Sequence, residues 1–162
     1  RRVLFRSALV SINQILLNAV TKEDITSTGK YFQSLMGYED VRIKDRGVKL
    51  LENSIALDIK TNDSLDNRIS NFYSDQIDEL DAENEVLNEV FYDFYDYCGS
   101  QPWFEEAMRG QGLNLFADEV LQNAEFRTRI LKYALILSGY RGQMSTFSTQ
   151  AKALIEEIKR QQ

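Results

Sequence analysis

The chain has 162 residues, of which 43% are hydrophobic and 27% charged, and its formal net charge is -6 at pH 7. That length corresponds to about one domain, which is large enough to bury a self-sufficient hydrophobic core. Histidine is absent and Cys98 is the single cysteine, which excludes a Ser-His-Asp or Cys-His nucleophile, a histidine-containing metal site and an intrachain disulfide. One proline and eight glycines disfavour a turn-rich β-fold and favour an all-α protein.

Two helices are predicted in the first part of the chain. Apolar side chains that alternate four and three residues apart predict a helix over about 3–19, because this spacing places them on one helical face. Asp24 is predicted as the N-cap of a second helix that ends near Leu35 or Met36, with Gly37 as its C-terminal stop. The apolar face of the first helix comprises Phe5, Leu9, Ile12, Leu16 and Ala19.

The middle of the chain is predicted to contain a short helix, an irregular crossover and a long helix. The short helix covers about 39–46 and ends at Gly47. Residues 48–62 alternate polar and apolar over a few positions but have no partner strand, which predicts an irregular connection. Asp63 is a suitable N-cap for a long helix over about 64–97. The apolar face of this helix comprises Ile69, Tyr73, Ile77, Leu80, Leu87, Phe91, Phe94 and Cys98.

The helical pattern is interrupted at residues 98–102, which contain the only proline, and the last third of the chain follows this interruption. Short helices are predicted over about 102–108 and 113–121, separated by the turn at 110–112. From 124 to about 160 the four-three alternation continues without a miss, which predicts one long helix with coiled-coil packing. Its apolar face comprises Phe126, Ile130, Tyr133, Leu137, Tyr140, Met144, Phe147, Ala151, Leu154 and Ile158.

The two long predicted helices define the expected architecture. Since their lengths and apolar seams are similar, we predict an all-α fold in which the helices over about 64–97 and 124–160 form a long antiparallel pair, with shorter helices packed across it. Residues 8–162 are predicted to form a single helical domain. Gly139 and Gly142 weaken the last helix by about 1 kcal/mol each relative to alanine, and close packing or a kink is the expected reason for them.

Charge is distributed unevenly along the chain. Residues 69–108 contain eleven acidic residues and no Lys or Arg. This argues against nucleic-acid binding, which depends on cations that neutralise phosphate. A solvated acidic helix face is the favoured interpretation of Asp75 to Glu89. Weak calcium binding is the alternative, although the stretch lacks the glycine of an EF-hand loop. We predict no catalytic residue, no cofactor and no metal site.

Aromatic residues are concentrated around residues 91–97, and two more follow the start of the interruption at 98–102. This density exceeds what one helical face needs for a core, and tyrosine and tryptophan are enriched where apolar area meets water. Phe91 and Phe94 are assigned to the intrachain seam. Packing in the core is the favoured interpretation of the other rings as well, and a second, partner-binding surface is the alternative. The predicted partner surface comprises Tyr92, Tyr95, Tyr97, Trp103 and Phe104.

A series of motifs runs through the middle and the end of the chain. It comprises Tyr38-Glu39-Asp40-Val41, Gly47-Val48-Lys49-Leu50-Leu51, Asn62-Asp63-Ser64-Leu65, Asn67-Arg68-Ile69, Phe72-Tyr73, Asn123, Phe126 and Leu154-Ile155-Glu156 with Ile158. These residues resemble an uncharacterised family of bacterial proteins common in Bacteroidetes, although Asp66 stands where that family usually has an arginine. The resemblance implies a helical, extracytoplasmic domain on a single membrane anchor that is missing from this chain, with no known catalytic residues.

The first seven residues, RRVLFRS, carry three arginines and no acidic group. They correspond codon for codon to AGA CGT GTG CTC TTC CGA TCT, the end of a widely used short-read sequencing adapter. We therefore interpret residues 1–7 as adapter-derived and exclude them from the functional argument. The reading frame is accordingly expected to be truncated at its start, where an anchor or signal would lie.

Two functional hypotheses from different classes follow. The first is a non-catalytic helical interaction or sensory domain of a membrane-anchored bacterial protein, which binds a protein partner or self-associates. The second is a cytoplasmic all-α homo-oligomeric scaffold, and a weakly metal-binding or carboxylate-dependent enzyme ranks last. About 20 apolar residues encoded in frame before Ala8 would support the first hypothesis, whereas a start codon close to Ala8 would exclude it.

Overall fold

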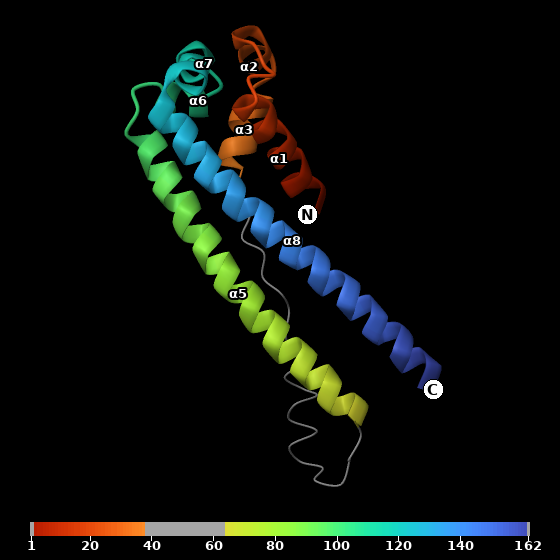
Figure 1. Ribbon diagram of the computed structural model, residues 1–162. Coiled ribbons are helices and arrows are strands. Elements are labelled where there is room, and N and C mark those ends of the chain that lie inside the picture. The colour runs from red at the N-terminus through yellow and green to blue at the C-terminus, as the bar shows by residue number, and fades with distance from the viewer. Residues whose placement is uncertain (1, 38–63, 162) are drawn as a thin grey trace. The chain divides into compact units, whose positions relative to one another are not determined.

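The computed structural model describes residues 2–37 and 64–161, and every regular element within these ranges is an α-helix (Figure 1). The all-α prediction is therefore confirmed. The helix predicted over 39–46, the crossover over 48–62 and the predicted cap Asp63 lie outside the described residues. The helices are α1 (Arg2–Leu16), α2 (Lys22–Thr28), α3 (Lys30–Met36), α5 (Ser64–Gly99), α6 (Phe104–Met108), α7 (Leu113–Gln122) and α8 (Ala124–Gln161).

The chain divides into two compact units. The first unit contains α1, α2, α3, α6 and α7, together with residues 86–99 of α5 and 124–141 of α8. The second unit contains residues 64–85 of α5 and 142–161 of α8. Within each unit the two long helices form an antiparallel pair, with α5 drawn from yellow to green and α8 in blue in Figure 1. The shorter helices pack against this pair in the first unit, as predicted.

The second predicted helix starts earlier than expected and is divided in two. Thr21 is the N-cap of α2: its hydroxyl accepts a hydrogen bond from the backbone N–H of Asp24 at 3.2 Å, and the Asp24 carboxylate accepts one from the backbone N–H of Thr21 at 2.8 Å. The prediction of Asp24 as the N-cap is therefore wrong, because Asp24 is the third helical residue of a capping box. Gly29, with φ of 61°, ends α2 in the left-handed conformation, and α3 begins at Lys30.

The two long helices have nearly the predicted bounds. The side chain of Asn123 caps α8, since its Oδ1 accepts from the backbone N–H groups of Glu125 at 2.9 Å and Phe126 at 3.1 Å. Along the predicted apolar faces of α5 and α8, each side chain that the structure describes is buried or half-buried. In the described part of the chain, no helix has a segment that is both long and apolar enough to cross a membrane.

Gly139 and Gly142 lie inside α8, which continues through both positions as one helix. A Cβ atom at either glycine would meet no atom of the described residues within 4 Å. Close packing within the described part of the chain therefore does not account for these two glycines, contrary to one of the two expected reasons.

Aromatic rings form the core of the first unit. Phe126 of α8 is completely buried and lies among rings from α5, α7 and the turn before α6. Its ring centroid lies between 5.6 and 6.3 Å from those of Phe94, Trp103, Tyr97 and Phe116. Aromatic pairs of this kind contribute about 0.5–1.5 kcal/mol each beyond the area that they bury. The rings therefore hold together helices that are distant in the sequence.

Arg127 ties the start of α8 to the ends of two other helices. Its guanidinium donates to the backbone carbonyl oxygens of Ile15 at 3.3 Å and Leu16 at 3.0 Å in α1, and to that of Val120 at 3.2 Å in α7. The last carbonyl groups of a helix have no partner within the helix and carry partial negative charge. Arg127 therefore donates to carbonyl groups at the ends of α1 and α7, and that of Ile15 also accepts from the backbone N–H of Asn18 at 3.1 Å.

Candidate functional site

Three residues of the predicted partner surface form what we call the aromatic edge: Tyr92, Tyr95 and Phe104. Tyr92 is 58% exposed, whereas Tyr95 and Phe104 are half-buried. The ring of Tyr95 stands edge-on to that of Phe104, with their centroids 5.3 Å apart. Tyr92 and Tyr95 also contact the buried Phe91, at centroid distances of 5.7 and 5.9 Å. The aromatic edge thus continues the core of the first unit out to its surface.

Trp103 lies in the core and not at the surface. It is only 3% exposed, and the rings of Phe32, Phe116 and Phe126 lie 6.5, 5.3 and 5.9 Å from it. Rings from α3, α7 and α8 thus contact the indole. Core packing, the favoured interpretation, therefore holds for Trp103. Its indole N–H has no hydrogen-bond partner among the described residues.

Tyr97 is half-buried and covered by a charged neighbour. The guanidinium of Arg129 lies 4.2 Å from the centroid of the Tyr97 ring, a distance at which cation–π attraction is effective. Burial raises the pKa of Tyr97, the negative charges of Glu125 and Glu119 raise it further, and Arg129 opposes them. Arg129 also pairs with Glu125 at 3.1 Å and Asp93 at 3.4 Å. Tyr97 therefore takes part in packing between α5 and α8.

Acidic side chains flank the aromatic edge in the sequence on both sides. Two of them have basic partners, since Asp93 pairs with Arg129 and Glu105 pairs with Arg109. All of these acidic side chains are exposed. The region around the aromatic edge is therefore anionic as well as apolar. The acidic residues are Glu89, Asp93, Asp96, Glu105 and Glu106.

Cys98 is completely buried at the end of α5. Burial raises the pKa of its thiol to about 12. The thiolate is the nucleophilic form of cysteine, and here it is both suppressed and enclosed. Cys98 therefore serves as a small buried hydrophobic residue.

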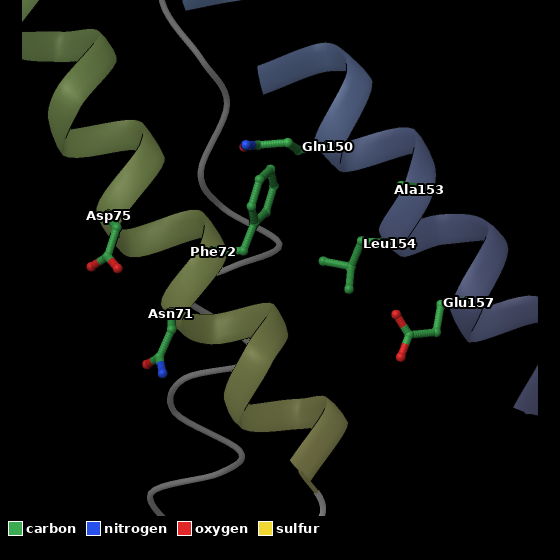
Figure 2. Close-up of a pocket in the computed structure, with 7 residues that line it drawn as sticks. All are labelled: Asn71, Phe72, Asp75, Gln150, Ala153, Leu154 and Glu157. Carbon is green, nitrogen blue, oxygen red and sulfur yellow. The ribbon is translucent and has the colours of Figure 1, made fainter. Parts of the chain in front are cut away.

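The second unit contains a pocket that the sequence did not predict (Figure 2). Its volume is about 420 Å³, which lies in the range of small-molecule sites. Asn71, Phe72 and Asp75 of α5 form one side of the pocket, and residues of α8 form the other. The lining residues of α8 are Gln150, Ala153, Leu154 and Glu157.

The pocket combines an apolar base with a polar, anionic rim. Figure 2 shows Phe72 and Leu154 pointing into the space between the two helices. Leu154 is buried and Phe72 half-buried, and the Phe72 ring stacks on Phe147 with centroids 5.4 Å apart. Asp75 contributes a carboxylate from α5 and Glu157 contributes one from α8. The lining therefore contains both hydrocarbon surface and acidic side chains.

The heptad repeat of the sequence does not indicate this pocket. The other lining residues of α8 follow Gln150 by three, four and seven positions, so all four lie on one side of the helix. The sequence shows that side as a mixture of polar and apolar residues and does not show which side of α5 lies opposite. Only the pairing of the two helices brings Asp75 and Glu157 to the same cavity.

Metal ligands are sparse in the described ranges. No group of three or more His, Cys, Asp or Glu side chains in residues 2–37 and 64–161 is placed to hold a metal ion. The pocket offers two carboxylates, whereas calcium takes six to eight oxygen ligands.

Comparisons with protein-family models, with curated proteins and with solved structures return no match to this chain.

Proposed function

We propose that this chain is a non-catalytic helical interaction domain whose aromatic edge binds a protein partner. The exposure of Tyr92 supports the proposal: 58% of this large side chain faces solvent, directly beside the buried Phe91. A tyrosine ring loses little conformational entropy when a partner covers it, and tyrosine is enriched among residues that dominate binding energy. Tyr95 and Phe104 extend the apolar area next to the same core.

Charge indicates the chemistry of the partner. The exposed carboxylates around the aromatic edge favour a surface that surrounds an apolar contact with Lys or Arg, because opposite potentials steer association and reject anionic competitors. Asp96 has no ion pair among those described, whereas Asp93 and Glu105 have intrachain partners. A second copy of the chain is the alternative partner, as in the scaffold hypothesis.

Attachment to a membrane and an extracytoplasmic location are part of the proposal. Their support is the resemblance to the membrane-anchored bacterial family, and a cytoplasmic scaffold is the alternative. The gene upstream of Ala8 tests this part: an encoded stretch of about 20 apolar residues would support an anchor. A start codon next to Ala8 would contradict it.

Substitution of Tyr92 tests the proposed surface. Tyr92→Ser removes the exposed ring and leaves the core rings in place, so we expect the fold to persist and partner binding to weaken about tenfold or more. Circular dichroism measures the fold. Quantitative affinity capture measures binding to a protein partner, and sedimentation velocity at several concentrations measures self-association.

Leu135→Ser is the matched control, because Leu135 is 64% exposed on α8 and is not part of the aromatic edge. Loss of the same partner from both variants would show a general effect of surface hydrophobicity. Unchanged binding and unchanged self-association of the Tyr92→Ser variant would rule out the aromatic edge as the partner surface. Tyr95 is less suitable for this test, since its ring contacts both Phe91 and Phe104.

A further inference from the structure

The aromatic edge and the acidic side chains around it suit one kind of protein partner. We propose that the edge binds a basic amphipathic helix. The apolar side of this helix covers Tyr92, Tyr95 and Phe104, and its Lys or Arg side chains reach the neighbouring carboxylates. The inference rests on the proposed function and narrows it from a protein surface in general to a single helical segment of defined charge.

The side of α5 that carries Tyr92 alternates acidic and aromatic side chains. Glu89 precedes Tyr92 by three positions and Asp96 follows it by four, so the three residues share one side of the helix. All three side chains are exposed. Neither Glu89 nor Asp96 has an ion pair with a described residue. Both carboxylates are therefore available to cationic groups of a partner.

The short helix α6 adds apolar area to the same edge. Phe104 and Met108 lie four positions apart, on one side of this helix. Met108 is 51% exposed, and methionine adapts well to partner surfaces because its side chain is unbranched and polarizable. The Phe104 ring contacts that of Tyr95, with their centroids 5.3 Å apart. Apolar side chains of two helices therefore contribute to one surface.

The spacing of these side chains favours a helical partner over an extended one. Extended peptides commonly bind at the open edge of a sheet, and every regular element of the described residues is a helix. Side chains three and four positions apart form ridges on a helix, and these ridges pack between the ridges of another helix. Glu89, Tyr92 and Asp96 form such a ridge. A partner helix can place one apolar and two cationic side chains opposite them.

The charge around the aromatic edge selects a basic helix over an acidic one. Glu106 of α6 is a third exposed carboxylate beside the edge, and no Lys or Arg occurs from Ile69 to Met108. A cationic helix is therefore attracted during approach, whereas an acidic helix is repelled. Each exposed ion pair contributes little free energy. The rings accordingly supply most of the affinity, and the carboxylates supply selectivity.

Fluorescence anisotropy with a labelled peptide tests the proposal on the whole chain. The probe is a leucine–lysine peptide of about four helical turns with its leucines on one side. We expect saturable binding in about 0.15 M salt, with a dissociation constant of roughly 50 µM, and a gain in helical circular dichroism on binding. A peptide of the same composition whose leucines are spread around the helix should bind at least about fivefold more weakly.

Substitutions in the chain separate the contribution of the ring from that of the carboxylates. Tyr92→Ser should weaken peptide binding about tenfold. Tyr92→Phe keeps the ring and should stay within about twofold of the native chain. Glu89→Gln combined with Asp96→Asn should weaken binding about three- to fivefold, because exposed ion pairs are weak. Circular dichroism of each variant shows whether the fold is retained.

Asp78→Asn combined with Asp81→Asn is the matched control, since it removes two exposed carboxylates from another part of α5. Asp81 lies eight positions before Glu89, about 12 Å along the helix. This separation exceeds the Debye length of about 8 Å at this salt concentration. The control variant should therefore bind the peptide as tightly as the native chain does.

Several outcomes would overturn the inference: equal affinity for the two peptides, equal weakening by the two double variants, or no saturable binding at about 1 mM peptide. Peptide binding that Tyr92→Ser leaves unchanged would also overturn it, because the peptide would then bind elsewhere. Failure of the proposed function is a different result. It would be seen as capture of a protein partner, or self-association, that Tyr92→Ser does not change.

Discussion

The two units contain segments of the same two long helices but differ in how completely those segments are covered. Among the described side chains that are buried, only Leu80 and Leu154 belong to the second unit. The first unit adds five shorter helices, whose apolar side chains enclose the faces of α5 and α8. The apolar repeat of α8 is equally regular in both units. Regular periodicity therefore predicts that helices pair, but it does not predict how completely the described side chains of the pair are buried.

The largest expected difference between the units concerns thiol reactivity. Ser74→Cys places a second thiol at an exposed position of the second unit. At pH 8 a thiol with a pKa of about 12 contains roughly a thousandfold less thiolate than an unperturbed one. We therefore expect the introduced thiol to react rapidly with Ellman's reagent and Cys98 at least about a thousandfold more slowly, as followed by absorbance.

The raised pKa of Cys98 also predicts a direction of pH dependence. The folded state holds the thiol proton more tightly than the unfolded state does, so this contribution to stability is complete below the unfolded pKa of about 8.5. It should decline as the pH rises from there toward 12. Urea titrations of the native chain and of Cys98→Ala at pH 7 and pH 10 would measure it, and an identical decline in both would contradict the assignment.

Large-to-small substitutions should show the next largest difference. Phe126→Ala removes the ring at the centre of the aromatic core and should lower the free energy of unfolding by about 3–5 kcal/mol. Phe72→Ala, at a half-buried position of the second unit, should cost about 1–2 kcal/mol. Urea denaturation followed by circular dichroism measures both. Equal losses would mean that the second unit is packed as tightly as the first.

A smaller effect is expected for Arg127→Met, which keeps the apolar stem and removes the three hydrogen bonds to backbone carbonyl groups. Hydrogen bonds to charged groups contribute more than neutral ones, so we expect a loss of about 2 kcal/mol. Lys132→Met, at an exposed position of the same helix, should change stability by less than about 0.5 kcal/mol. Thermal unfolding of the two variants compares them, and equal midpoints would show that Arg127 does not join α8 to α1 and α7.

The smallest expected effect is a gain in stability at the helical glycines. Gly139→Ala and Gly142→Ala should each stabilise α8 by up to about 1 kcal/mol, because no described atom lies within 4 Å of the added Cβ. Gly112→Ala should act in the opposite direction, since Gly112 has φ of 65° and an added Cβ would lie 2.7 Å from the Glu106 carboxylate. Chemical denaturation measures all three. Destabilisation by Gly139→Ala would indicate that this glycine faces a close neighbour.

Structural features that depend on neighbouring residues could be predicted from the sequence. The apolar spacing of α5 and α8 predicted their bounds closely, because one helical face repeats every three to four residues regardless of what covers it. The start of α2 was misplaced, since Thr21 and Asp24 both suit an N-cap and only their reciprocal hydrogen bonds decide which of them is the cap. Gly29 was likewise missed as the residue that separates α2 from α3.

The sites required more than local signals. The aromatic residues around the interruption at 98–102 were recognised from sequence, but their division between core and surface was not, because Trp103 is buried by rings from α3, α7 and α8. The sequence did not predict the pocket. Asp75 and Glu157 are far apart in the sequence, and they line the same cavity only because α5 and α8 pair.

The sequence by itself determined the all-α class, the two long helices and the acidic character of the middle segment, because helical periodicity and charge are properties of neighbouring residues. Only the tertiary structure decided that Trp103 lies inside while Tyr92 lies outside, that Arg127 joins three helices, and that the second unit contains a pocket. Each of these outcomes depends on contacts between residues distant along the chain, and such contacts arise from packing, which no local pattern encodes.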